Sequence, residues 1–337
     1  MKKQILILAL LLPLLAGCTA KQPEPLPCTP GEAQRLVVYT SHKEEVYTPI
    51  IREFEERTGI WVDVVSGGTN ELLQRIQQEA DAPKADVMFG GGVESLESYQ
   101  DCFSPYICRE AAGISEQFQA ESGYWTPFSA LPVVLVYNTK LVAPESLTSW
   151  KDLESPAFRG KIAFADPQIS GSSYTALVTR LQTGGEMEDS LTRLCTALDG
   201  KQLDSSGAVL TAVADGSALV GITLEETALQ HIAAGEDIAL VYPSDGTSCV
   251  PDGSALVKGA PHGDNARLFL DFTVSTDVQS MVGQRFCRRT VRADIPADPS
   301  LPPLSTLNMV SYDVEWASQN RDRLLSEWSF LLGEVPS

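Results

Sequence analysis

The sequence predicts an α/β protein built as two lobes, and three observations support this. From residue 36 onward, short apolar runs alternate with helical spacing, as in a parallel sheet flanked by helices. A long apolar run at 131–137 then interrupts the pattern and indicates a fully buried strand. The chain has 337 residues, 43% of them hydrophobic, which is enough for two packed cores.

The first lobe is expected to begin with three strand–helix units. Apolar runs predict strands at 36–40, 61–65 and 86–89. Apolar residues recur every three or four positions in the segments that follow, and they predict helices at 46–57, 71–80 and 93–99. Gly59 is expected to end the first helix, and glycine-rich turns precede the other two.

The second lobe is expected to follow the same alternation. Its predicted strands are 131–137, 161–165, 218–222 and 239–242, and its predicted helices are 174–181, 209–215 and 225–234. A strand at 254–257 and a helix at 265–274 are expected to return to the first lobe, before a last amphipathic helix at 314–331. We therefore assign 34–131 with 251–300 to the first lobe, and 132–250 with 301–337 to the second.

The N-terminal segment has the layout of an export signal. Lys2 and Lys3 precede an apolar stretch at 5–15 that is too short to span a bilayer. The stretch ends in Leu-Ala-Gly-Cys, which resembles a bacterial lipoprotein signal whose Cys18 is acylated. We predict a signal peptide at 1–17, a proline-rich tether at 18–33, and a mature protein anchored outside the cytoplasmic membrane by lipidated Cys18.

The net charge of −19 narrows the choice of partners. Nucleic acid demands a basic surface, so we exclude it as a partner. An acidic surface also repels anions at long range, so any anion site must act through local groups. We expect a monomer that needs no cofactor.

Six cysteines remain after Cys18, and an exported protein can form disulfides. Six cysteines allow 15 pairings, of which we favour Cys102 with Cys108, because they flank a Ser-Pro turn. A zinc site is not expected, since the chain has no Cys-x-x-Cys and only three histidines.

Three segments share the order strand, Gly/Ser/Thr-rich turn, helix. A helix N-terminus carries unpaired backbone N–H groups and a positive dipole, so it can bind an oxyanion without arginine or lysine. Glycine admits a ligand close to the backbone, and all three turns follow the carboxyl ends of strands, where α/β sheets bind ligands. The residues concerned are Gly67, Gly68 and Thr69; Gly90, Gly91 and Gly92; and Ser170, Gly171, Ser172 and Ser173.

Two further polar groups are candidates for ligand contact. Thr40, Ser41 and His42 follow the first strand, where they either contact a ligand or cap the next helix. Glu225 and Glu226 either accept hydrogen bonds from hydroxyl or amino groups, supply oxygen ligands to a metal, or form an ordinary acidic first turn.

Two other groups are weaker candidates. For the basic pair at 288–289, a surface salt bridge is the better interpretation than a place near the cleft. Nucleophilic catalysis is poorly supported, because the chain has no Gly-x-Ser-x-Gly elbow and no His-Glu-x-x-His motif. A secreted hydrolase that uses His42 or Ser172 stays as an alternative.

The order of these segments resembles the ferric-iron branch of the solute-binding proteins of ABC transporters. That branch includes binders of thiamine, aminoethylphosphonate and sugar phosphates. The similarity runs from the segment at 37–44 through 54–60, 85–89, 137–139, 150–153, 158–162 and 166–167 to 253–258, which covers nearly all of the mature chain. The succession of motifs identifies the superfamily better than it identifies the ligand.

The resemblance implies a two-lobed clamp of the type II periplasmic-binding-protein fold. The lobes of such a clamp close on a small solute, which a permease and an ATPase then import. A sensory subunit that reports a solute to a membrane kinase is an alternative with the same fold.

The resemblance also bears on the ligand. Iron-binding members use a histidine, a glutamate and two adjacent tyrosines. His42 matches the histidine, but the glutamate position falls near Gly91, and the tyrosine pair falls on Glu225 and Glu226. Thiamine binders stack aromatic rings, for which Tyr174 is the obvious candidate. We therefore predict an anionic solute, with an organophosphate or phosphonate ahead of ferric iron, a ferric chelate or thiamine.

Overall fold

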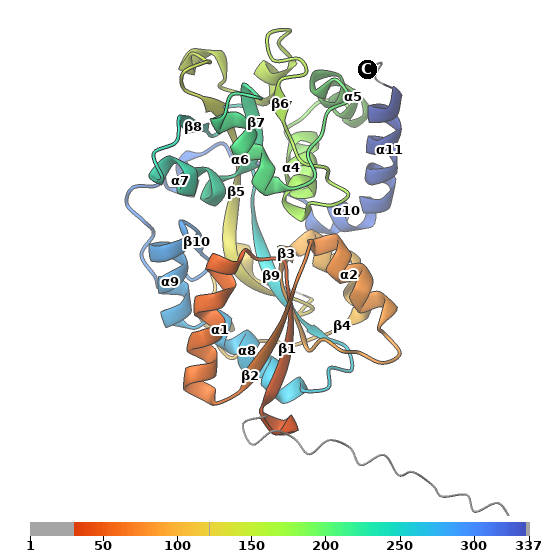
Figure 1. Cartoon of the computed structure of the whole chain (residues 1–337), viewed down its shortest axis with the longest axis vertical. Helices are drawn as coiled ribbons and strands as arrows, with labels where there is room; N and C mark the ends of the chain where they lie inside the picture. The colour runs from red at the N-terminus through yellow and green to blue at the C-terminus, as the bar shows by residue number, and fades with distance from the viewer. Residues whose placement is uncertain (1–29, 121, 335–337) are drawn as a thin grey trace, which may run out of the picture.

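The computed structural model describes residues 30–120 and 122–334, and it confirms the two-lobed α/β fold (Figure 1). The predicted signal peptide, lipidated Cys18, most of the tether and Cys28 lie outside the described residues. Within the described ranges, no helix is long and apolar enough to cross a membrane.

Lobe 1 is the part of the molecule around three parallel strands in the order β2-β1-β3. Each strand leads into a helix: β1 (Arg35–Thr40) into α1 (Glu44–Thr58), β2 (Trp61–Ser66) into α2 (Thr69–Gln78), and β3 (Val87–Gly92) into α3 (Val93–Ser98). Helices α8 (Gly263–Thr273) and α9 (Thr276–Phe286) and the short strands β4 (Phe103–Ser104) and β10 (Arg289–Thr290) complete the lobe. Edge-to-face aromatic pairs, such as Phe54 with Phe269 and Phe89 with Phe128, help to fill its core.

Two long strands connect the lobes. β5 (Thr126–Asn138) pairs with β9 (Cys249–Val257) and β10 through its first half, and with strands of the other lobe through its second half. β9 in turn runs antiparallel to β3, so the sheets are mixed. Both strands are buried along almost their whole length, as expected for segments covered on both faces.

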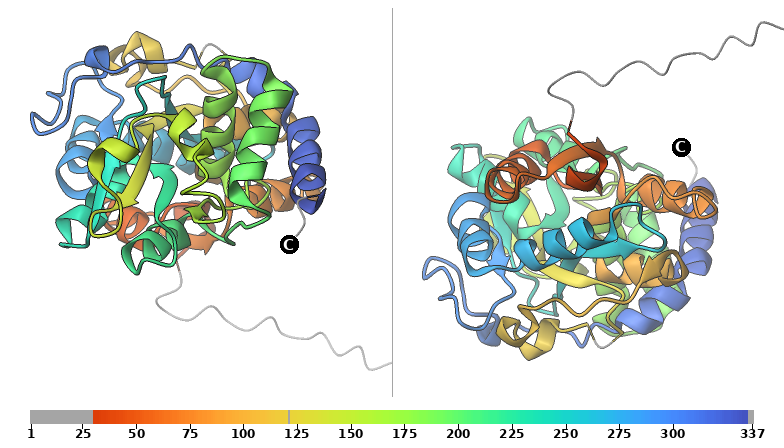
Figure 2. Two further views of the ribbon diagram at one scale, coloured as in Figure 1. Left: turned by 90° about the horizontal axis from the view of Figure 1, so that it is seen from above. Right: turned by 90° about the horizontal axis from the view of Figure 1, so that it is seen from below.

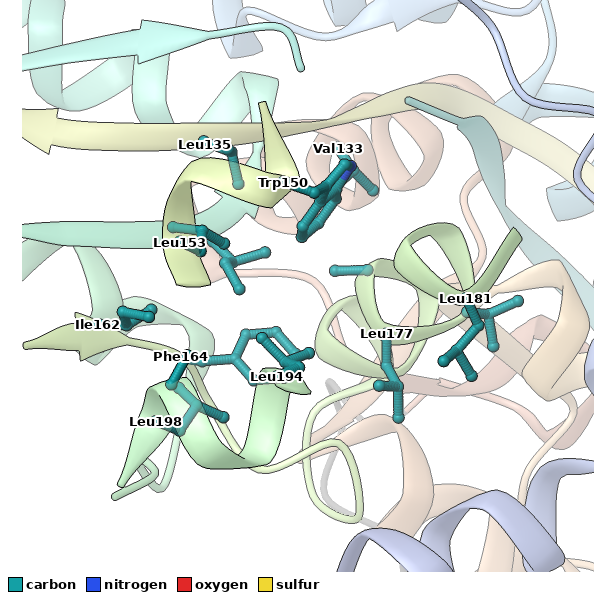
Figure 3. Packing of buried hydrophobic residues seen from close by; sticks show 14 of the residues in the cluster. Val133, Leu135, Trp150, Leu153, Ile162, Phe164, Leu177, Leu181, Leu194 and Leu198 are labelled. Atoms are coloured by element: carbon teal, nitrogen blue, oxygen red, sulfur yellow. The ribbon is translucent and has the colours of Figure 1, made fainter. Parts of the chain in front are cut away.

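Lobe 2 is the part around β6 (Ile162–Ala163), β7 (Val220–Leu224) and β8 (Ile238–Val241), the last two paired antiparallel to β5. Its helices are α4 (Gly171–Gln182), α5 (Met187–Leu198), α6 (Ser206–Ala214) and α7 (Glu225–Ala233). Trp150, Leu153, Phe164, Leu177 and Leu194 meet in its core (Figure 3). Seen from above, α4 and α5 stand side by side over this core (Figure 2).

The C-terminal segment contacts both lobes. The expected single helix is interrupted at Asn320, between α10 (Val314–Gln319) and α11 (Arg321–Glu334). α11 packs on α5 of lobe 2, and Leu324 and Trp328 belong to that core. α10 packs on α3 of lobe 1. Ala317 of α10 also belongs to the core of lobe 2, so this segment bridges the two lobes.

The predicted disulfide between Cys102 and Cys108 is wrong. Both are free thiols, as are the other three cysteines among the described residues. The reason is that the intervening strand β4 pairs with β9 and carries the two thiols to different places. Cys102 packs beside the core under α2 and α3, whereas Cys108 is buried with Ile114 and Phe118.

Polar contacts join the lobes beside α2 and α3. Asn70 donates to the carbonyl of Gln168 at 2.5 Å and accepts from Arg321 at 2.5 Å. Glu94 on α3 accepts a hydrogen bond from Thr175 on α4 and is fully buried. These contacts hold the two lobes against each other along one side of their boundary.

A buried carboxylate fixes the start of lobe 1. Asp86 is fully buried and accepts from the backbone N–H of Val37 at 2.7 Å and of His262 at 2.6 Å. The Nδ1 atom of His262 lies 2.8 Å from Asp86, and its Nε2 lies 3.1 Å from Glu32. Burial opposes the charge of this imidazole, but the hydrogen bonds to Asp86 and Glu32 outweigh it, so the pKa of His262 is raised.

This histidine predicts a pH-dependent stability. A raised folded-state pKa gives stability that is fully present below the unfolded value of about 6.5 and is lost as the pH rises through the folded value. We expect His262→Gln to lower the Tm by about 2–4 °C at pH 6 and by less at pH 9. Thermal melts across this pH range measure it, with His231→Gln on the surface of α7 as the control. An equal loss at both pH values contradicts the charged imidazole.

The buried carboxyl group of Glu94 predicts a second pH dependence of the stability. Burial raises the pKa of Glu94, against the hydrogen bond from Thr175. Because the folded-state pKa lies above the unfolded one, its stability is present below the unfolded value of about 4.3 and is lost as the pH rises through the folded value. Glu94→Gln should therefore raise the Tm by about 2–4 °C at pH 8 and by little at pH 4. Melts with the exposed Glu71→Gln as control measure this, and a variant less stable than wild type at pH 8 contradicts it.

Candidate ligand-binding cleft

A cavity of about 200 Å³ lies between the lobes. Six helices begin at it, three from each lobe, because in each lobe the carboxyl ends of the strands face the boundary. The N-cap residue of every one of these helices lines the cavity: Lys43 of α1, Gly68 of α2, Gly92 of α3, Ser170 of α4, Ser205 of α6 and Leu224 of α7. The cavity is therefore surrounded by the positive ends of helix dipoles.

The N-termini of α2 and α4 meet across the cleft. A Cβ atom added to Gly171 would lie 3.1 Å from the Oγ1 atom of Thr69, so the two helix ends are in contact distance. No side chain caps α2 at Gly68, whereas Ser170 caps α4 by accepting from the N–H of Ser173. The hydroxyls of Ser170 and Ser172 lie 3.0 Å apart beside them. The N–H and O–H donors of this corner suit an anion, and the nearby carboxylates are those of Asp204 in the lining and of the buried Glu94 beside Gly92.

The other side of the cavity has a buried ionic network. Arg288 is 6% exposed and donates to Asp252 at 2.6 Å, to Ser129 at 3.0 Å and to Glu226 at 3.3 Å. Burial opposes its charge, but the nearby carboxylates of Glu226 and Asp252 outweigh this and raise the pKa of Arg288. The guanidinium therefore stays charged and pairs with two carboxylates that line the cavity.

Three of the buried polar atoms without a protein partner belong to residues that line this cavity. The Oε2 atom of Glu226, the Nε2 atom of His42 and the Nε atom of Arg288 are buried and make no hydrogen bond within the chain. Burial, and then the charge of Arg288, hold the pKa of His42 well below its usual range, so the imidazole is neutral. Unsatisfied groups of this kind are costly unless a ligand or water completes them.

Ten of the predicted contact residues line the cavity, and five do not. The ten are Ser41, His42, Gly68, Thr69, Gly91, Gly92, Ser170, Gly171, Ser172 and Glu226. The five outside it are Thr40, Gly67, Gly90, Ser173 and Glu225.

Each of these five has a local reason for its position. Thr40 donates to the carbonyl of Phe89, and Ser173 donates to Ser170. Gly67 faces Leu72 of α2, and Gly90, at a φ of +106°, is packed under Ser41 and His42. The carboxylate of Glu225 is turned away to a bidentate ion pair with Arg289. These five positions shape the cleft rather than line it.

The sequence analysis missed several lining residues. Arg288 was assigned to the surface, but α9 and β10 place it inside the boundary, where Asp252 of β9 and Glu226 compensate its charge. Ser205 and Ser206 were missed because the helix at 209–215 was predicted to start three residues too late. The Ser-Ser-Gly triplet at 205–207 after Asp204 is the N-cap signal that could have found them. Nothing comparable marks Asp252.

The carboxylates of the cleft do not form a metal centre with its histidine. Among the described residues, no group of three or more His, Cys, Asp or Glu side chains is arranged to hold a metal ion. The Nδ1 atom of His42 lies 3.7 Å from Asp252, and the guanidinium of Arg288 is bonded to that same carboxylate. A cation entering this group would meet a buried positive charge.

Comparison with known proteins gives consistent results. The family model described as a bacterial extracellular solute-binding protein matches residues 36–285. Iron uptake protein A1 of Synechocystis sp. is 26% identical over 306 residues, which cover 86% of this chain and 84% of that protein. A putative 2-aminoethylphosphonate-binding periplasmic protein of Salmonella typhi is 22% identical over 262 residues, covering 73% of this chain and 74% of that protein. The structure of the periplasmic binding protein AfuA from Actinobacillus pleuropneumoniae, with fructose-6-phosphate bound, has a TM-score of 0.83 and 25% identity, and covers 89% of this chain and 99% of that one.

The family model spans most of the chain. The matched regions cover 84% of the Synechocystis protein and 99% of the AfuA chain. Their named ligands differ, which leaves the solute open. The class of protein is not open, because all are extracytoplasmic binding proteins rather than enzymes. The chain therefore belongs to the family of bacterial extracellular solute-binding proteins.

Proposed function

We propose that this binding protein is lipid-anchored through Cys18 and captures a sugar phosphate in the cleft between its lobes. The anchor rests on the N-terminal sequence, where a short apolar stretch ends in Leu-Ala-Gly-Cys. The choice of solute rests on one observation above the others. The cavity combines a corner rich in N–H and O–H donors with an ion-paired wall in which Glu226 keeps one unpartnered acceptor oxygen.

The donor-rich corner is the place for the phosphate. Uncapped N–H groups of α2 and the hydroxyls of Ser170 and Ser172 converge there, and glycine at 68 and 171 lets the two helix ends approach each other closely. Such donors act over a few ångströms, which suits a chain whose overall charge of −19 repels anions from a distance. Lys43 at the start of α1 adds a positive charge to the lining.

The ion-paired wall favours hydroxyl groups over an ammonium group. Arg288 already pairs with Glu226 and Asp252, so neither carboxylate of this wall is free for an ammonium group; Asp204, elsewhere in the lining, has no such ion pair. The unpartnered Oε2 of Glu226 can still accept a hydrogen bond from a neutral O–H. This argument places a sugar phosphate ahead of an aminophosphonate.

The same wall argues against ferric iron as the solute. The two residues at the position of the tyrosine pair are Glu225 and Glu226, and each is bound to an arginine. A trivalent cation would have to displace a guanidinium that the surrounding carboxylates stabilise. Thiamine has less support, because Tyr174 is fully buried and its hydroxyl donates to the carbonyl of Ala317.

Calorimetry with the soluble chain from residue 30 onward tests the solute. We expect fructose 6-phosphate or glucose 6-phosphate to bind, and 2-aminoethylphosphonate, ferric citrate and thiamine to bind much more weakly or not at all. Tight binding of ferric citrate with no response to sugar phosphates overturns the proposal and leaves the family unchanged. Metabolic labelling with a fatty acid, compared between wild type and Cys18→Ala, tests the anchor separately.

A charge placed at the phosphate corner gives a sharper test. Ser172→Asp puts a carboxylate beside the expected phosphate and should weaken sugar-phosphate binding about 100-fold or more, through like-charge repulsion at short range. Ser172→Asn has nearly the same size without the charge and should lose about tenfold or less. Titration of both variants measures the difference, and equal losses would place the phosphate elsewhere in the cleft.

A further inference from the structure

Two adjacent arginines of lobe 1 form ion pairs with two adjacent glutamates of lobe 2. Arg288 and Arg289 follow α9, and Glu225 and Glu226 begin α7, which lies directly above β10 and α9 in Figure 1. Arg289 pairs with Glu225, and Arg288 pairs with Glu226. We call these four residues the interlobe clasp, with Arg289–Glu225 as its outer pair and Arg288–Glu226 as its inner pair.

The outer pair is strong and lies close to the place where β5 passes from one lobe to the other. Arg289 donates from Nε at 2.7 Å and from Nη2 at 2.8 Å, a bidentate geometry, and the side chain of Glu225 is 1% exposed. Arg289 pairs with Ala130 of β5, and the residue before Glu225 pairs with Val133 of the same strand. Only a short piece of one strand therefore separates the two partners, and a rotation of the lobes about that strand moves them little.

The inner pair has a different construction. Arg288 is fixed to lobe 1 by short bonds to Asp252 and Ser129, but it reaches Glu226 through one bond of 3.3 Å. Both inner residues line the cavity, and neither outer residue does. The Oε2 atom of Glu226 and the Nε atom of Arg288 are left without partners. The inner pair is thus the weaker link and the one that a solute can touch.

We propose that the outer pair is a fixed pivot between the lobes and that the inner pair couples occupancy of the cleft to the angle between them. A solute that hydrogen-bonds to Glu226 orients its carboxylate toward Arg288, and the completed contact holds lobe 2 against lobe 1. Glu226 acts here as a positioning residue, since it sets the lobe angle in addition to touching the solute. The coupling rests on the proposed function, whereas the pivot does not.

The first test needs no solute. Glu225→Gln leaves the bidentate guanidinium of Arg289 without its anion, so we expect the Tm of the free protein to fall by about 5 °C or more. Glu226→Gln should lower it by less than about half as much, because Arg288 keeps Asp252 and Ser129. Arg57→Gln, in an exposed ion pair with Asp277 inside lobe 1, is the control and should change the Tm little. Equal losses in the two glutamate variants overturn the pivot.

The second test uses fructose 6-phosphate and small-angle X-ray scattering. Saturating solute should reduce the radius of gyration of the wild type and of Glu225→Gln by similar amounts. Glu226→Gln should bind about tenfold more weakly and keep a larger radius even at saturation. If Glu226 only contacted the solute, full compaction would return at saturation, and that result overturns the coupling. Arg288→Lys, which keeps the positive charge, should show part of the compaction that the wild type shows at saturation.

The two proposals fail in different ways. If wild type neither binds nor compacts with any sugar phosphate, the proposed function fails and the coupling falls with it, while the pivot still stands or falls on the Tm comparison. If wild type binds and compacts but Glu226→Gln compacts equally, the solute is right and the coupling is wrong.

Discussion

The structure depends on one constraint, the convergence of helix N-termini on a single interlobe cavity. β5 pairs with strands of both lobes and β9 joins its first half to β3, so that the carboxyl ends of the two sets of strands face each other. Each strand-to-helix turn then delivers a positive helix end to the boundary. An acidic chain can hold an anion in this way, because the donors are backbone groups that contribute nothing to its net charge of −19.

The paired arginines decide what the acidic residues of the cleft can do. Two buried guanidinium groups, Arg288 and Arg289, stabilise the buried carboxylates of Glu225, Glu226 and Asp252, and removing one partner would leave an uncompensated charge. Pairing also changes the chemistry of the wall from a cation trap to a set of hydrogen-bond acceptors. The similar iron uptake protein and the similar fructose-6-phosphate complex thus share a fold but need not share the polarity of this wall.

The sequence predicted the local part of this structure well. β1, β2, α1, α2, α7 and α8 fall within a few residues of their expected bounds, because apolar periodicity and glycine turns are local signals. Two helices were not predicted, α5 and α9, although α5 carries buried Leu191, Leu194 and Leu198 at the spacing of a helix. The position of Arg288 depends on Asp252 and Glu226, which lie far away along the chain, so no local pattern reveals it. The glycine-rich turns of the cleft could thus be predicted from the sequence, whereas the ion pairs of Arg288 could not.

The interlobe contacts differ in character on the two sides of the cavity, and this asymmetry bears on how the lobes separate. Near the place where β5 passes from one lobe to the other, bidentate ion pairing is buried and would be costly to break. On the α2 and α4 side, the buried Asn70 meets Gln168 and Arg321 through hydrogen bonds and not through an ion pair, and these groups can bond to water when the lobes part. Opening is therefore expected on the side of Asn70. A solute that bridges α2 and α4 adds contacts there in the closed form only, which is the condition for it to shift the balance toward closure.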